Sequence, residues 1–207
     1  PMDKLTAFSN TSHPLTTAQE IVWIEQLLAP TSPRYNIGSI VCFDGLVDLQ
    51  LFEKAIEDVV DQHDAMRLVL DADAPDLLPR QRLCKTVPTF LEHIDLSMHD
   101  DEADLRAKML IDDVFKTPFT VFDQPLWRFI WIRISATRAY WVLCFHHLIA
   151  DGISVSLIGN AVAETYRQLV EAPGVEGPDG LPAAVEALGP VGARHRVIAG
   201  EDLCVGH

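Results

Sequence analysis

Residues 140–152 read YWVLCFHHLIADG, and this stretch decides how the surrounding chain folds. The apolar run over residues 140–145 predicts a buried strand. The run ends at two histidines, His146 and His147, and the Asp151-Gly152 pair that follows predicts a tight turn. Histidine is the usual general base near neutral pH, and the end of a strand is a rigid place to hold one.

The spacing of the two histidines limits what they can do together. Adjacent residues on a strand point to opposite faces, so His146 and His147 do not look into one pocket. A shared metal site is disfavoured, because it would need both imidazoles and Asp151 around one ion. We expect one histidine to face a cavity and the other to pack behind it, while Asp151 folds back through the turn beside Gly152. The alternative is a buried strand with two hydrogen-bonded histidines and an ordinary Asp-Gly turn.

Helix and strand patterns alternate along the rest of the chain. Thr16 or Thr17 caps a helix that Pro30 ends, Asp48 caps a second helix, and Gly152 opens a last long one. The apolar residues expected to face inward are Ile21, Ile24 and Leu28 in the first helix and Phe52, Ala55, Ile56, Val59 and Val60 in the second. A further helix is expected over residues 101–115, and strands over residues 37–43, 66–70, 126–135 and 139–146. The last two strands form a hairpin, and the whole reads as an α/β sandwich.

Composition limits the class of protein. The 207 residues suit one domain, and a formal net charge of -14 argues against nucleic acid as a partner. No apolar run reaches the length of a membrane span, and no signal-peptide pattern opens the chain. The scattered cysteines indicate reduced thiols in a cytoplasmic protein. They are Cys42, Cys84, Cys144 and Cys204.

The chain divides into three parts by composition. We expect a leader over residues 1–14, a folded lobe over residues 15–170, and a tail over residues 171–207 that is rich in Pro, Gly and Ala. The tail shows no strong helix or strand pattern, so we expect it to be weakly ordered.

Several motifs resemble, in order and spacing, those of the condensation domains of nonribosomal peptide synthetases. The His-His-x-x-x-Asp-Gly motif at residues 146–152 is their signature, shared with related acyltransferases of the chloramphenicol-acetyltransferase fold. Residues 15–19, followed by Trp23, are similar to the first family motif. Residues 63–67 resemble the second, with Gln62 in place of its first arginine. Further fits are Tyr35-Asn36, Leu51-Phe52 with Ala55, Pro118-Phe119 and residues 125–128.

The resemblance implies a chloramphenicol-acetyltransferase-like two-layer α/β sandwich that forms only the N-terminal lobe of a pseudo-dimeric domain. Motifs of the family's second lobe are absent from this sequence. The family's active site lies in a tunnel between the lobes, so the resemblance implies a C-terminal lobe as partner and an isolated chain that is inactive. An uncovered lobe face would also favour a homodimer.

The resemblance further implies acyl transfer from a phosphopantetheine thioester on a donor carrier protein to an amine, or a hydroxyl, on an acceptor carrier. His147 lies at the reacting centre, and His146, Asp151 and Gly152 complete the motif. Asp151 is expected to form a structural ion pair with Arg67. The chain itself is expected to hold no cofactor and no metal, because the phosphopantetheine belongs to the carriers.

Two alternatives stay open. The first keeps the fold but takes the acyl group from coenzyme A, and a requirement for carrier proteins separates it from the leading hypothesis. The second is a non-catalytic module that binds a carrier or a partner lobe. The missing lobe favours this module, whereas the intact His147, Asp151 and Arg67 count against it.

Overall fold

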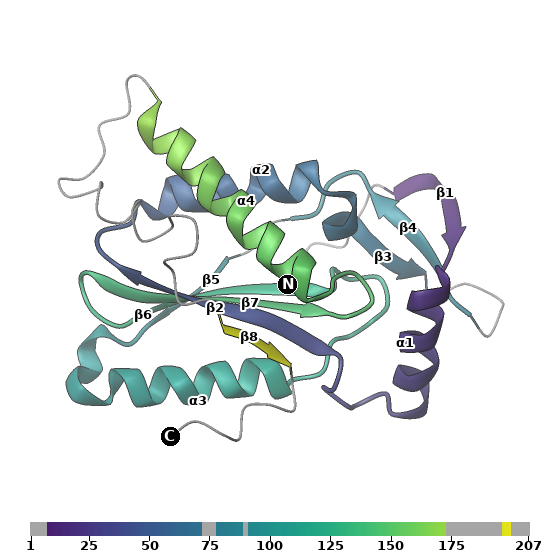
Figure 1. The fold of residues 1–207 in the computed structure, drawn as a ribbon, viewed down its shortest axis with the longest axis horizontal. Coiled ribbons are helices and arrows are strands. Elements are labelled where there is room, and N and C mark those ends of the chain that lie inside the picture. Colours follow the sequence, from purple (N-terminus) through teal and green to yellow (C-terminus); the bar gives the residue numbers. More distant parts are fainter. Residues whose placement is uncertain (1–7, 72–77, 89–90, 173–195, 200–207) are drawn as a thin grey trace.

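A computed structural model of the chain describes residues 8–71, 78–88, 91–172 and 196–199, which form two sheets and their covering helices (Figure 1). The elements, in chain order, are β1 (Phe8–Pro14), α1 (Thr17–Leu28), β2 (Asn36–Asp44), α2 (Leu49–Gln62), the 3-10 helix η1 (Asp64–Arg67), β3 (Leu68–Asp71), β4 (Arg80–Cys84), β5 (Leu91–Asp95), the 3-10 helix η2 (Ser97–Glu102), α3 (Ala103–Lys116), β6 (Trp127–Arg133), β7 (Arg138–His146), α4 (Gly152–Glu171) and β8 (Arg196–Ala199).

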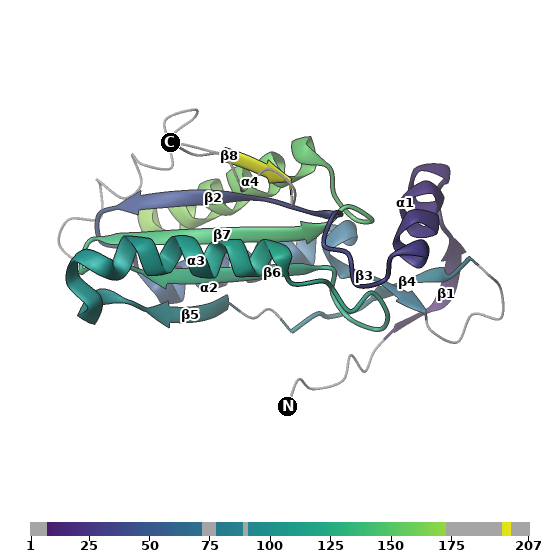
Figure 2. The same cartoon turned by 90° about the horizontal axis from the view of Figure 1, so that it is seen from below.

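The larger sheet has the strand order β5-β6-β7-β2-β8, with the predicted β6–β7 hairpin at its centre. Alternation along β7 sends Trp141, Leu143 and Phe145 toward α2 and α4, and Val142 and Cys144 toward α3. These five side chains are all at most 1% exposed. A strand that is apolar on both sides needs cover on both sides, so the expected α/β sandwich gains a third layer, α3, on the second face (Figures 1 and 2).

Helix α2 follows its sequence pattern closely. Its predicted apolar stripe is buried, with Phe52, Ile56 and Val60 each 0% exposed. The ring of Phe52 meets Trp141 edge to face at 5.0 Å between centroids. Asp48 caps the helix, since its Oδ1 accepts the backbone N–H groups of residues 50 and 51 at 3.0 and 3.1 Å. The expected helix, its cap and its buried face are all confirmed.

A smaller sheet, in the order β1-β4-β3, lies at one end of the molecule together with α1 (Figures 1 and 2). The expected leader therefore needs correction, because Phe8–Pro14 form β1 and pair antiparallel with β4. Arg80 holds this pairing from its side chain, with Nε donating to Ser12 Oγ and Nη2 to Ser12 O, both at 2.8 Å. The strands β1, β4 and β5 carry short, polar sequences, which is why the sequence patterns predict no strand there.

Helix α1 begins and ends where the sequence predicts, but the prediction of its inward face is wrong. Ile21, Ile24 and Leu28 are 59%, 49% and 81% exposed. Trp23 and Gln26 are the buried residues of this helix. The inward face is therefore polar and aromatic, and its partners belong to the site described below.

Three of the four cysteines lie in the described part of the chain. Cys84 and Cys144 are buried, Cys42 is half-buried, and all three are free thiols. Cys204 lies outside the described residues.

The helices of the described part include none that is long and apolar enough to cross a bilayer. Most of residues 171–207, for which we expect weak order, lie outside the described residues. The described part of this segment comprises the end of α4, residue 172 and the strand β8.

Candidate active site at the end of strand β7

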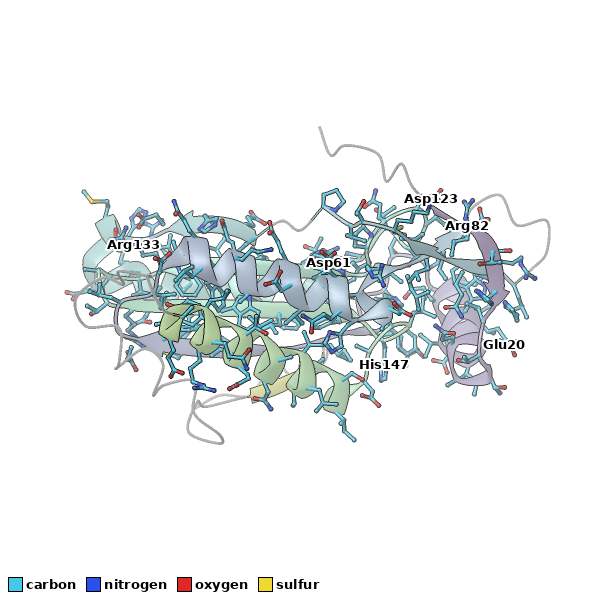
Figure 3. All side chains as sticks on the ribbon, turned by 90° about the horizontal axis from the view of Figure 1, so that it is seen from above. Glu20, Asp61, Arg82, Asp123, Arg133 and His147 are labelled. Carbon is cyan, nitrogen blue, oxygen red and sulfur yellow. The ribbon has the colours of Figure 1, made fainter. Side chains whose placement is uncertain are left out.

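The two histidines stand in different environments. His146 is the last residue of β7 and is 2% exposed, whereas the next residue, His147, is exposed. In Figure 3 His147 lies between the first turn of α4 and the end of the molecule that carries α1. Its backbone N–H donates to the carbonyl oxygen of Tyr35 at 2.8 Å, and the N–H of His146 donates to that of Leu126 at 2.8 Å. The structure therefore separates the pair, as strand alternation predicts.

His146 uses both of its ring nitrogens within the protein. Nδ1 accepts the backbone N–H of Leu148 at 3.2 Å, so Nε2 carries the ring proton and donates to Gln26 Oε1 at 3.2 Å. Burial, followed by the nearby His147 and Arg128, lowers the pKa of His146 from 6.5 to about 4. His146 is therefore neutral at physiological pH and has no free nitrogen to bind a metal. Its ring stabilises the turn through the hydrogen bond from the Leu148 N–H.

Two glutamines on α1 hold this turn, and no sequence pattern assigns them that role. Gln26 is 4% exposed, and its Nε2 donates to the carbonyls of Ala29 and Pro30 at 3.3 and 3.0 Å, which leaves Oε1 facing His146. Gln19 Nε2 donates to the carbonyl oxygen of Leu148 at 3.0 Å. Their spacing of seven residues places both on one helix face, and Gln19 also lies in the first family motif, so these are the signals in the sequence that could have found them.

The N-terminal end of α1 is fixed by the same Gln19. Thr16 Oγ1 accepts the Gln19 N–H at 3.3 Å while Gln19 Oε1 accepts the Thr16 N–H at 2.9 Å, which is a capping box. Gln19 also exchanges amide hydrogen bonds with Gln81 of β4, at 3.0 and 3.2 Å. Gln19 thus joins α1, the small sheet and the histidine turn.

Asp151 and Gly152 begin α4. Asp151 is the N-cap, and its Oδ1 accepts both the backbone N–H and the hydroxyl of Ser154, at 2.8 and 2.7 Å. These two hydrogen bonds, with a smaller contribution from His147, lower the pKa of Asp151 below its usual 3.8. Gly152 is the first helical residue and has no positive φ, so its conformation does not demand glycine. Both residues shape the turn that follows His147.

The expected ion pair between Asp151 and Arg67 is wrong. Arg67 Nη2 pairs with Asp64 at 2.5 Å, and its Nη1 donates to the carbonyls of Lys85 and Cys84 at 3.3 and 3.4 Å. Within the part of the chain that the structure describes, no ion pair joins Arg67 to Asp151. The reason is local, since Arg67 donates to the carbonyls of Cys84 at the end of β4 and of Lys85 just after it, while the Asp151 carboxylate is occupied by the cap of α4.

A second support for the site lies behind His146. Arg128 donates to the carbonyls of residues 114, 117 and 118 at 3.3, 2.7 and 2.6 Å, and its guanidinium lies 3.9 Å from the ring centroid of Phe119. Asn36, 1% exposed, donates to the carbonyls of residues 115 and 117 at 2.8 and 2.9 Å. Together they satisfy the free carbonyls at the end of α3 and hold Phe119 edge-on to His146, at 6.0 Å between rings.

The chemistry available at the site follows from which groups are free to react. In residues 8–71, 78–88, 91–172 and 196–199 no three His, Cys, Asp or Glu side chains gather as a metal site would require. Burial raises the pKa of Cys144 to about 12 and also raises that of Cys84, so neither is a ready thiolate nucleophile. The Ser154 hydroxyl is engaged by Asp151. Within the His-His-x-x-x-Asp-Gly motif the exposed side chains are His147 and Asp151, and the Asp151 carboxylate is engaged by Ser154, so His147 is the exposed side chain that does not serve as a helix cap.

The fold and the site define a lobe of the chloramphenicol-acetyltransferase type with its histidine motif at a strand end. The family profile of the condensation domain matches residues 9–178. The chain belongs to the condensation domain family. One of the plipastatin synthase subunits of Bacillus subtilis is 31% identical over 161 residues, which cover 78% of this chain and 6% of that protein. Surfactin synthase subunit 1 of the same organism is 30% identical over 174 residues, which cover 83% of this chain and 5% of that protein.

Solved structures agree with this assignment. The first condensation domain of the calcium-dependent antibiotic synthetase, in complex with a substrate analogue, matches with a TM-score of 0.72 at 28% identity, over 82% of this chain and 40% of that one. The starter condensation domain of the rhizomide synthetase matches with a TM-score of 0.71 at 28% identity, over 78% of this chain and 40% of that one. The chain thus spans well under half of the solved chains and a small fraction of the curated relatives.

Proposed function

We propose that this chain is the N-terminal lobe of a condensation domain that joins a carrier-bound acyl or peptidyl thioester to an amine, or a hydroxyl, on a second carrier protein. The observation that carries the proposal is the exposed His147 at the end of β7, held by a buried neutral His146. A histidine placed this way can exchange a proton with a substrate while its backbone stays fixed. The match to condensation domains, one of them solved with a substrate analogue, supports the same reaction.

The proposed chemistry is direct attack. The acceptor nitrogen bonds to the thioester carbonyl carbon and the carbon–sulfur bond breaks. An unprotonated ring nitrogen of His147 takes the proton that the amine loses and passes it to the departing sulfur. General-base help of this kind is worth about 10²–10⁴-fold in rate, and positioning of two tethered substrates supplies the rest. The raised pKa of Cys144 supports a route without a covalent enzyme intermediate.

The partners we propose are a C-terminal lobe and the donor and acceptor carriers. Among the described residues, exposed apolar side chains line α1, with Ile21, Ile24 and Leu28, and the start of α4, with Ile153 and Leu157, which are 72% and 62% exposed. Helix α3 also exposes Leu105 and Met109, at 62% and 63%. Exposed apolar side chains that recur along one helix face are typical of surfaces that a partner covers. In the chain alone the same surfaces favour a homodimer, and we expect little or no transfer without the second lobe.

A coenzyme A thioester is the second candidate donor. The starter condensation domain of rhizomide synthetase, solved as a mutant in complex with C8-CoA, matches this chain with a TM-score of 0.70 at 26% identity, over 78% of this chain and 36% of that one. A free acyl-coenzyme A would then replace the donor carrier. Transfer from free acyl-coenzyme A at the rate seen with a loaded carrier would favour this donor.

The test is the His147→Ala variant in a protein that joins this chain to a C-terminal lobe. We expect transfer between two loaded carriers to fall by about 10²–10⁴-fold while circular dichroism stays unchanged. His13→Ala is the matched control, because His13 is an exposed histidine on β1. A rate for His147→Ala equal to that of the control would remove His147 from the chemistry. Carrier binding without any transfer, even with both lobes present, would favour the non-catalytic module.

A further inference from the structure

We propose that Gln19 and Gln26 of α1 are positioning residues, which fix the position of His147 by hydrogen bonding to the residues on either side of it, Leu148 and His146. The inference deepens the proposed function, since it concerns the same histidine. Its physical basis is a set of hydrogen bonds that can be examined without any assay of transfer.

Buried polar side chains concentrate at this point of the described structure. They are Gln26, Asn36, Ser39, Gln81 and His146, each at most 8% exposed. Three of them, Gln26, Gln81 and His146, belong to the network around the histidine turn. Burying such groups is unfavourable unless each is hydrogen-bonded, so a network of this kind specifies one geometry.

The orientation of α1 follows the same network and the burial of Trp23, and not the stripe of Ile21, Ile24 and Leu28. Gln19 and Gln26 are two helical turns apart and both face the turn, with Trp23, 5% exposed, between them. Trp23 meets the ring of Phe122 edge-on at 5.4 Å. A helix placed by apolar burial alone would turn its exposed isoleucines inward. We conclude that the contacts of the two glutamines, together with the burial of Trp23 in the hydrophobic core, outweigh that preference.

These contacts bracket His147. The N–H of Leu148 is bound by His146 Nδ1, and the carbonyl oxygen of Leu148 is bound by Gln19 Nε2. Gln26 fixes the ring of His146 from the other side, and Gln26 is itself fixed by the carbonyls at the end of its own helix. The residues before and after His147 therefore have no freedom to shift unless α1 moves with them.

The environment of His146 allows these hydrogen bonds to be tested by changing the protonation of its ring with pH. The charged or titratable groups that influence its ring are His147 and Arg128 from β6, and the aromatic rings beside it are Phe119 and Tyr35, whose hydroxyl donates to Glu25. No carboxylate among the described residues contacts the ring. Gln26→Glu would place one beside Nε2 and favour the protonated ring. A protonated Nδ1 could not accept the N–H of Leu148, so the turn would lose a bond.

The first arm of the test is ¹⁵N NMR of the imidazoles in the 207-residue chain. We expect His146 of the wild type to stay neutral, with its proton on Nε2, from about pH 5 to 8, and to titrate inside that window in Gln26→Glu. Gln50→Glu makes the same change on an exposed glutamine of α2 and should leave His146 unchanged. A proton on Nδ1 in the wild type, or no titration in Gln26→Glu, would overturn the inference.

The second arm measures transfer in the two-lobed protein. Gln26→Glu should lose about tenfold or more in rate as the pH falls through the titration of His146, while Gln50→Glu follows the wild type. Gln19→Glu keeps an acceptor for the Thr16 N–H but cannot donate to Leu148, so it should slow transfer about tenfold with the helix intact. Unchanged rates and pH profiles would refute a positioning role. A wild type without transfer would instead refute the proposed function, and the NMR arm would still test the hydrogen bond between Gln26 and His146 on which this inference rests.

Discussion

Helices α1 and α2 are close in length and both begin at a side-chain cap, yet they are held in opposite ways. Helix α2 buries the apolar stripe that its sequence predicts, with Phe52, Ile56 and Val60 fully covered. Helix α1 exposes its apolar stripe and turns Gln19 and Gln26 inward. A helix that builds the core follows the hydrophobic pattern, whereas one that builds the site follows its polar partners. The hydrophobic pattern of a helix is thus a reliable guide only where nothing polar competes for the inward face.

The difference also concerns energy. Burial of large apolar side chains contributes several kcal/mol at each position, while a hydrogen bond contributes about 0.5–1.5 kcal/mol net. We therefore expect α2 to govern global stability and α1 to govern the geometry of the histidine turn. Four measurements test this division.

The largest effect is expected in α2. Phe52→Ala removes a ring that is 0% exposed and contacts Phe43, Trp131, Trp141 and Tyr166. The loss of burial and the cavity left behind should lower the free energy of unfolding by about 3–5 kcal/mol, as measured by urea denaturation. A cost below about 1 kcal/mol would mean that α2 is not the main support of the core.

The next effect is a pH dependence that originates on the α1 side. The pKa of His146 is lowered to about 4 in the folded chain from 6.5, so the unfolded chain binds the proton more readily. Stability should therefore fall as pH drops from 6.5 to about 4, by roughly 3 kcal/mol at most. His146→Asn cannot titrate, so its stability should fall less over the same range. If the free energy of unfolding fell equally with pH in the wild type and in His146→Asn, His146 would not be buried in its neutral form.

The third effect concerns the two aspartate N-caps: Asp151, which caps α4 next to the histidine turn, and Asp48, which caps α2. At the start of its helix Asp48 accepts two backbone N–H groups, and Asp151 accepts one backbone N–H and the Ser154 hydroxyl. Asp151→Ala and Asp48→Ala should therefore each lower the free energy of unfolding by about 1 kcal/mol, as measured by urea denaturation. Asp151→Asn should retain most of the stability, because Asn is also a good N-cap. A loss of about 3–5 kcal/mol for Asp151→Ala alone would instead indicate a buried ion pair with Arg67.

The smallest effect is expected on the outer face of α1. Ile24→Ser and Leu28→Ser change side chains that are 49% and 81% exposed, so each should alter the stability of the chain by less than about 0.5 kcal/mol. Thermal denaturation of the chain at low concentration measures this. A loss above about 2 kcal/mol would show that this face is covered in the free chain, for example by a second copy.

The amino-acid sequence by itself determined the elements whose signals are local. The apolar runs over residues 126–135 and 139–146 specified the β6–β7 hairpin, and the stripe after Asp48 specified α2 with its buried face. Asp151-Gly152 marked the start of α4, and the ordered motifs indicated the condensation domain family, which the family profile confirms. The signals for the helices and strands lie within short stretches of the chain, where periodicity and capping suffice, whereas the family assignment rests on a resemblance of several motifs in order over residues 15–152.

Only the tertiary structure decided which histidine is buried and which way α1 faces. The pairing of Arg67 with Asp64, three positions apart, is by contrast a local contact. The deciding hydrogen bonds join residues far apart in the chain: Gln26 and His146 are 120 positions apart, and Gln19 and Leu148 are 129 apart. No local pattern carries that information. A buried polar group takes whichever partner the folded chain brings within reach, and an apolar stripe stays outside when the inward face is already occupied by such partners.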